Sequence, residues 1–224
     1  MRIFKTEKVA FSVTNHAEQF LNGLTANSLD KPQNAFVNIH GRIVATFDQL
    51  KIAADEFLVL IEKSFVENVF SHIDKFVRLS QVHIERKNEY VYFDLDGDVP
   101  WGKGDYVIQQ KKGRLIITQR EWEVNVSCQE FSLFRLKCRI PWHGVDYRDE
   151  FLLNVSTEDF VSFTKGCFLG QEPIAKVYNR SKPTWRLEVR YEDECDEEAR
   201  QKMTSKVKDP GTHRVMGFVF IKNE

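Results

Sequence analysis

One stretch decides how this chain is expected to fold, Lys165-Gly-Cys-Phe-Leu-Gly-Gln-Glu172, followed at once by Pro173. Its two glycines favour an exposed loop, and proline is favoured in the first turn of a helix. The sequence therefore predicts a helix over about residues 172–179 that begins directly after the loop. The free N–H groups and the positive dipole end of that helix are expected to face Cys167.

Cys167 carries the most reactive side chain of this loop. Lys165 lies two positions before it, and both a nearby lysine and a helix N-terminus favour the thiolate, the form that acts as nucleophile and as ligand for soft metals. A buried cysteine that packs as a small apolar side chain is the alternative, and we prefer that interpretation for Cys128, Cys138 and Cys195. We interpret Cys167, with Lys165 beside it, as a functional thiol site.

The composition is that of an ordinary globular protein. Of 224 residues, 42% are hydrophobic and 29% are charged, and a net charge of −1 gives no whole-molecule attraction to nucleic acid or membrane. The cysteines and histidines show no zinc-site spacing, so we expect no metal site and reduced thiols. The N-terminal segment mixes acid with base and has no apolar block. We therefore expect neither a signal peptide nor a transit peptide, and a cytoplasmic protein.

Two segments have the form of a capping box, Asn15-His-Ala-Glu18 and Ser64-Phe-Val-Glu67, and each predicts a helix. Apolar residues at helical spacing follow both. The segment 57–61 is apolar on both faces, which indicates a central strand. Residues 129–136 fit helix or strand. Further strands are predicted at 36–39, 43–47, near 52, and at 81–86, 90–95, 106–109, 114–118, 185–191 and 217–221.

Strands that alternate with few helices, without regular βαβ units, predict an α+β fold. Residues 94–104 hold three glycines, one proline and three acids, and are the predicted subdomain break. We expect residues 1–182 to form one domain, with two ferredoxin-like subdomains around a central cleft that the 165–172 loop lines. Residues 183–224 are expected to form a shortened C-terminal β tail.

The segment Phe163-Thr-Lys-Gly-Cys-Phe-Leu-Gly-Gln-Glu-Pro-Ile-Ala175 resembles the signature of the YgfZ family, Lys-Gly-Cys-aromatic-x-Gly-Gln-Glu, at all eight positions. Weaker similarities to this family lie at residues 21–27, 41–43 and 135–144. The resemblance covers roughly residues 10–190, and the C-terminal barrel expected of the family is shortened here to residues 185–222.

The resemblance implies the folate-binding fold of the glycine-cleavage aminomethyltransferase, with tetrahydrofolate or a derivative as cofactor. It implies a role in iron–sulfur cluster assembly or repair, including iron–sulfur enzymes that modify transfer RNA. The expected partners are folate and iron–sulfur assembly factors or client enzymes, with no direct contact to nucleic acid or membrane. Because one thiolate supplies only one of the about four ligands of a cluster, such a role needs a partner.

The resemblance also implies cofactor-binding residues. Arg180 belongs to a basic stretch that either meets the glutamate tail of a folate or is a solvated face. The complete expected set is Asn27, Arg42, Gly170, Gln171, Glu172 and Arg180.

Two positions depart from the aminomethyltransferases. Their pterin-gripping glutamate is replaced by Lys137, and a nearby glycine by Arg139. Residues 44–46, Val-Ala-Thr, stand where those enzymes place an aspartate. These departures favour a non-catalytic accessory protein over the second hypothesis, an active tetrahydrofolate-dependent aminomethyl- or methyltransferase. A nucleic-acid-binding module ranks third, because the sequence has no basic stripe, aromatic RNP pair or helix-turn-helix pattern.

Overall fold

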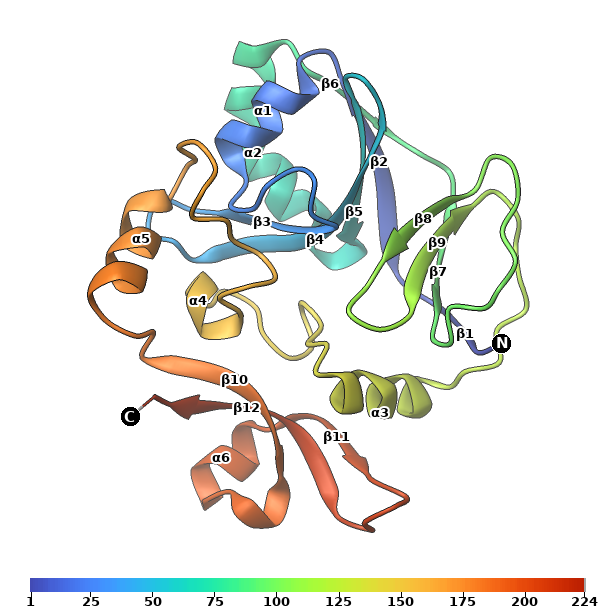
Figure 1. The fold of residues 1–224 in the computed structure, drawn as a ribbon, viewed down its shortest axis with the longest axis vertical. Helices are drawn as coiled ribbons and strands as arrows, with labels where there is room; N and C mark the ends of the chain where they lie inside the picture. The colour runs from blue at the N-terminus through green and yellow to red at the C-terminus, as the bar shows by residue number, and fades with distance from the viewer. Residues whose placement is uncertain (224) are drawn as a thin grey trace.

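The computed structural model describes residues 1–223, which form three sheets (Figure 1). The strand order is β3-β4-β5-β2-β6 in the first sheet, β1-β7-β9-β8 in the second and β10-β12-β11 in the third. Neighbouring strands pair antiparallel throughout these sheets. The expected mixed α/β architecture with antiparallel sheets is therefore confirmed.

The strands are β1 (Ile3–Lys5), β2 (Lys8–Thr14), β3 (Gln33–Val37), β4 (Ile43–Ala53), β5 (Glu56–Glu62), β6 (His83–Arg86), β7 (Tyr90–Asp94), β8 (Tyr106–Gln109), β9 (Arg114–Thr118), β10 (Trp185–Tyr191), β11 (Thr204–Lys208) and β12 (Val215–Lys222). The helices are α1 (Ala17–Leu24), α2 (Val66–Ser80), α3 (Cys128–Cys138), α4 (Leu152–Val155), α5 (Gln171–Arg180) and α6 (Glu197–Lys202), with 3-10 turns at Lys63–Phe65 and Glu192–Glu194. The segment 129–136, which fitted helix or strand, is helical.

The central strand β5 is buried on both faces, as its sequence predicts. Phe57, Val59 and Ile61 pack with α1, α2 and the neighbouring strands in one core. Leu58 and Leu60 point to the opposite face and pack with the second sheet and α3 in another core. Because side chains alternate along a strand, this one strand contributes to both cores.

The C-terminal sheet docks on α3. Leu136 of α3 packs with Met216 and Phe218 of β12. Beside this contact, the buried Arg135 guanidinium donates to the Asp146 carboxylate at 2.5 Å and also to a hydroxyl of β11. Figure 1 shows this sheet at the opposite end of the molecule from α1 and α2.

The cap expected from Asn15 at the start of α1 is supplied by another residue. Asn15 donates its side-chain amide to the Gln81 carbonyl, and His16 takes the N-cap position in a left-handed conformation without a side-chain cap. The Asp55 carboxylate, from the turn between β4 and β5, accepts hydrogen bonds from the His16 and Glu18 amides at 2.6 and 3.3 Å. The capping-box prediction is wrong here because a carboxylate distant in sequence satisfies the helix end.

The second predicted capping box, at Ser64, is also wrong. Ser64 lies inside the 3-10 turn Lys63–Phe65, and α2 begins at Val66 with no side-chain cap. Phe65 is buried and stacks on His143 with ring centroids 3.7 Å apart, so tertiary packing sets the start of this helix. A capping box does open α3, where the Ser127 and Glu130 side chains each accept a hydrogen bond from the other's backbone amide.

The predicted subdomain break at residues 94–104 falls inside the second sheet. This segment joins β7 to β8, and both strands pair with β9. Asp94 orders the turn, because its carboxylate accepts hydrogen bonds from the Gly97 and Val99 amides and pairs with Arg114. The chain passes from the first sheet to the second at residues 87–89 instead.

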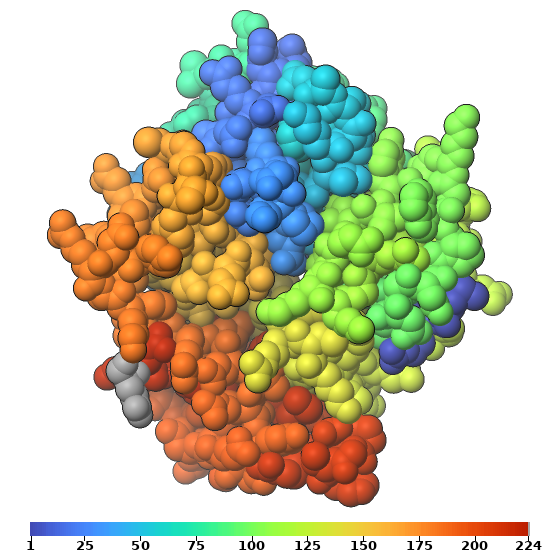
Figure 2. All heavy atoms as spheres, in the orientation of Figure 1, coloured from blue at the N-terminus to red at the C-terminus, as the bar shows by residue number. Residues whose placement is uncertain are grey.

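The space-filling view places the first sheet and its helices at the top, the second sheet at the right and the tail at the bottom (Figure 2). The segment from α4 to α5, in orange, occupies the left side of this face. Among residues 1–223, no helix combines the length and the apolar character needed to cross a bilayer.

We predict that Ser127→Ala lowers the free energy of unfolding by about 1 kcal/mol, because it removes the side-chain acceptor at the start of α3. Ser64→Ala is the matched control and should change this free energy by less than about 0.5 kcal/mol, since Ser64 is exposed and caps no helix. Urea unfolding measures both. Equal losses in the two variants would contradict this assignment of the caps.

Candidate functional site

Residues 165–170 form a loop that leads directly into α5, as the sequence predicts. Cys167 is exposed, together with Gly166 before it. The next side chain, Phe168, is only 7% exposed and packs with Val37 and Ile174 in the core between β3, α4 and α5. The loop therefore buries its aromatic residue and leaves the thiol at the surface.

Lys165 ties this loop to the end of α1. Its ammonium donates hydrogen bonds to the Thr25 and Asn27 carbonyls at 2.6 and 3.0 Å, and lies 5.3 Å from the centre of the Phe168 ring. Burial lowers the pKa of Lys165 to about 8. The sequence placed Lys165 as the activator of Cys167, but its hydrogen bonds are directed at the backbone of residues 25–27. Lys165 is thus a positioning residue that holds the loop.

The far end of the loop is fixed by backbone contacts. The Leu169 amide donates a hydrogen bond to the Gly23 carbonyl at 3.0 Å. Gly170 caps α5 with a φ of 82°, and a Cβ atom there would collide with the Asn38 carbonyl of the β3–β4 turn. The loop is held between the end of α1 and this turn.

The structure brings together only part of the expected cofactor-binding set. The half-buried Gln171 and the exposed Glu172 open α5 next to the thiol loop. Asn27 is buried, and its side-chain amide donates to two backbone carbonyls at 2.9 Å, which gives it a structural role. Arg42 is engaged in a surface ion pair. Arg180 ends α5, about 14 Å along the helix from its start.

The cavity between the first two sheets holds a charged cluster that the sequence did not predict. The Lys8 ammonium lies 3.0 Å from the Asp48 carboxylate and 2.6 Å from the Glu62 carboxylate, and these three side chains are 8%, 6% and 7% exposed. The Trp142 ring lies 4.7 Å from the same ammonium. The two carboxylates outweigh the effect of burial and raise the pKa of Lys8 above its ordinary value.

Neutral polar side chains complete the wall of this cavity. The Gln110 amide donates to Asp48 at 2.8 Å, and the hydroxyls of Thr46 and Tyr147 lie 2.6 Å apart. His143 is 5% exposed, and neither ring nitrogen finds a hydrogen-bond partner among residues 1–223. Burial and the positive charge of Lys8 lower the pKa of His143 to about 3, so this imidazole is neutral.

The thiol loop does not line this cavity, contrary to the expectation from the sequence. The cavity is lined by residues of the four strands β2, β3, β4 and β5 and of the turn after β8. Leu115, Phe160 and the segment 140–147 complete its wall. Lys165 and Leu169 bind the backbone near the end of α1, and these hydrogen bonds keep the loop there.

Tetrahydrofolate, the cofactor implied by the family resemblance, does not fit the central cavity. Asp48 and Glu62 have the chemistry to grip the guanidine-like edge of a pterin, but both are already paired with Lys8. The cavity volume is about 30 Å³, enough for a water molecule, whereas small-molecule sites span roughly 300–1,000 Å³.

The two residues that replace the aminomethyltransferase glutamate and glycine also lie outside the cavity. Lys137 is half exposed and pairs with Asp209 of the tail at 3.0 Å. Arg139 ends α3 in a left-handed conformation, with a φ of 53°. Neither side chain belongs to the cavity wall.

A solved protein structure shares this fold. Glycine cleavage system aminomethyltransferase T from Bartonella henselae superposes with a TM-score of 0.76, over 98% of this chain and 78% of that protein, at 12% sequence identity. The chain has an aminomethyltransferase-like fold. At this identity the similarity shows the fold alone.

Sequence comparison also finds a distant relative. A protein of Haemophilus influenzae, described as uncharacterized, is 21% identical over 147 residues, which cover 62% of this chain and 52% of that protein. The chain therefore spans about half the length of this curated relative. No protein-family model matches the chain.

We predict that Gly170→Ala disrupts the thiol loop, because the new Cβ meets the Asn38 carbonyl and the φ is left-handed. The free energy of unfolding should fall by about 1–3 kcal/mol, and hydrogen exchange of the Leu169 amide should become faster. Gly166→Ala is the control within the same loop, since a Cβ there meets nothing within 4 Å. Similar losses in both variants would show that the loop is not held at Gly170.

We predict that Lys8→Met lowers the free energy of unfolding by about 3–5 kcal/mol at pH 7, because two buried carboxylates lose their cation. This loss of unfolding free energy should become smaller as the pH falls, because protonation neutralises the Asp48 and Glu62 carboxylates. In the wild type, the ion pairs of Lys8 stabilise the fold fully below pH 10.5, the ordinary pKa of lysine. This stabilisation is lost as the pH rises through the raised pKa that Lys8 has in the folded protein.

The control for this prediction is Lys51→Met, which removes an exposed ion pair with Glu18. It should change the free energy of unfolding by less than about 1 kcal/mol. Urea unfolding between pH 4 and 8, at about one-unit steps, measures both variants. A Lys8→Met protein as stable as the Lys51→Met control at pH 7 would contradict the cluster's role.

Proposed function

We propose that this chain is a YgfZ-type accessory protein that supports iron–sulfur cluster assembly or repair through the thiol of Cys167. The observation that carries the proposal is an exposed cysteine on a loop that is fixed at both ends. A structural cysteine is usually buried among apolar side chains. Here the neighbouring Phe168 takes the buried place, and the thiol faces solvent.

The thiol can act only together with another molecule. Once deprotonated, its sulfur can serve as a ligand for iron, but a cluster takes about four ligands. A carrier or a client enzyme must supply the others. In this proposal the fixed loop presents one ligand at a defined place, which limits the entropy lost when the partner docks. Iron–sulfur enzymes that modify transfer RNA are among the proposed clients.

The second hypothesis, a tetrahydrofolate-dependent aminomethyl- or methyltransferase, has less support. Such chemistry needs room for a pterin and a free carboxylate near its reacting nitrogens. The central cavity offers about 30 Å³, and Asp48 and Glu62 are both paired with Lys8. We therefore assign the function to the thiol and derive no step through a folate.

We predict that Cys167→Ala and Cys167→Ser abolish the support of iron–sulfur enzymes while leaving the fold intact. A small side chain on an exposed loop should change the free energy of unfolding by less than about 0.5 kcal/mol. The chemistry of the sulfur is lost outright, and serine restores the size of the side chain but not its affinity for iron.

The matched control is Cys128→Ala, because Cys128 is also exposed but lies at the start of α3. The activity of an iron–sulfur client enzyme is measured in cells that carry only one variant, with the amount of each variant checked by immunoblot. Full client activity with Cys167→Ala at normal protein level would overturn the proposal. Equal loss with Cys128→Ala would show that the defect is not specific to the loop.

A further inference from the structure

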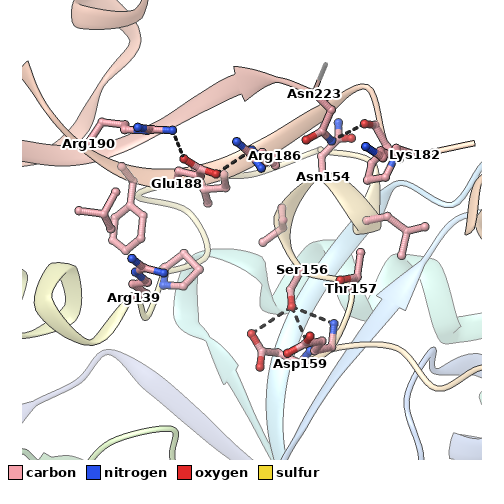
Figure 3. Close-up of a pocket in the computed structure, with 18 of the residues that line it drawn as sticks. Arg139, Asn154, Ser156, Thr157, Asp159, Lys182, Arg186, Glu188, Arg190 and Asn223 are labelled. Carbon is pink, nitrogen blue, oxygen red and sulfur yellow. Dashed lines mark hydrogen bonds and ion pairs between the residues drawn. The ribbon is translucent and has the colours of Figure 1, made fainter. Parts of the chain in front are cut away.

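A groove of about 770 Å³ runs between β10 of the tail and the residues that end and follow α4 (Figure 3). This volume lies within the range of small-molecule binding sites. Cys167 is not among the residues that line it, so the groove is separate from the thiol loop. It lies where the tail meets the rest of the molecule.

The groove concentrates positive charge, although the whole chain carries a net charge of −1. Three acids also line it, Glu158, Asp159 and Glu188, so the lining charge is five minus three, or +2. The cations come from four separate segments, and Arg139 lies across the groove from β10 (Figure 3). The five cations are Lys111, Arg139, Lys182, Arg186 and Arg190.

Two of these cations already hold a carboxylate. The Glu188 carboxylate lies 2.6 Å from the Arg186 guanidinium and 2.7 Å from that of Arg190. For Lys111, Arg139 and Lys182, no ion pair with another side chain is found among residues 1–223. The groove therefore retains cations whose charge the described part of the chain does not neutralise.

The rest of the lining suits a ligand with a hydrocarbon skeleton. Its apolar wall is formed by Leu187, Val189 and Phe218. A polar side chain, Asn154, also lines the groove. Asn154 is only 8% exposed, and its carboxamide forms no hydrogen bond within residues 1–223. The carboxamide atoms are not among the buried polar atoms that lack a partner, so they are open to the groove and can meet a ligand there.

We propose that this groove binds a small aliphatic oligocarboxylate. Arginine guanidinium groups match the planar carboxylate, as the pairs with Glu188 already show. The apolar wall accommodates the carbon chain between the carboxylates. Arginine also binds phosphate, but phosphate sites commonly add the backbone amides of a glycine-rich loop at a helix N-terminus, and no glycine lines this groove. The inference concerns a second site and does not depend on the proposed role of Cys167.

The test is calorimetric titration of the full chain at low ionic strength with tricarballylate, a three-carbon chain that carries a carboxylate on each carbon. Its uncharged triamide is the ligand control. The variant Arg139→Gln/Lys182→Gln should bind tricarballylate at least about tenfold more weakly, because two of the cations that no carboxylate of the described chain pairs with are lost. Arg78→Gln is the protein control, since Arg78 is an exposed cation on α2 and pairs with Asp74.

Saturable 1:1 binding that is weakened in the double variant and unchanged in Arg78→Gln supports the proposal. Equal affinity in wild type and double variant, or no binding of tricarballylate, overturns it. Tighter binding of inorganic pyrophosphate would reassign the groove to phosphates. Tighter binding of a penta-glutamate peptide would reassign it to a protein partner. Circular dichroism and thermal unfolding confirm beforehand that each variant is folded.

Discussion

The burial of β5 on both faces is the constraint on which the rest of the structure depends. Its odd-numbered apolar residues, such as Phe57, belong to the core beneath α1 and α2, and its even-numbered ones, such as Leu58, to the core shared with the second sheet. Its backbone is also paired on both edges, with β2 and β4. The two sheets therefore pack together through β5, with Ala10 of β2 and Leu50 of β4 beside it, and separating them would expose apolar side chains to water.

This arrangement decides what happens between the two sheets. The charged residues Lys8, Asp48 and Glu62, at the ends of β2 and β5 and within β4, are nearly buried there. The Lys8 ammonium forms ion pairs with both carboxylates, and these pairs offset the cost of burying the charges. Buried ion pairs add little net stability, but each partner is needed once the others are present. The result is a small polar cavity in a fold that the Bartonella henselae aminomethyltransferase shares.

The two candidate functional sites lie away from this central cavity. The thiol loop is fixed by two contacts of opposite character, the burial of Phe168 and the hydrogen bonds of Lys165 to the backbone, and these together leave Cys167 exposed. The cationic groove lies at the junction of the tail with α4 and the end of α3. The tail therefore contributes to this candidate binding site, because β10 forms one wall of the groove.

The sequence by itself determined the features that depend on local periodicity. Apolar patterns predicted most of the strands, though not β1, β2 or β11, and the continuous apolar run of β5 predicted its central position. The glycines and Pro173 predicted the exposed loop and the start of α5. These signals are local because a strand or a helix turn is built from neighbouring residues. The signature around Cys167 could be found for the same reason.

Only the tertiary structure decided which distant side chains meet. Asp55 caps α1 in place of Asn15, and Lys8 pairs with residues 40 and 54 positions later, at 48 and 62. The groove likewise collects its cations from separate segments. No local pattern encodes such contacts, because they depend on how the sheets pack, and the energy of a charged group depends on the partners and the burial that packing provides.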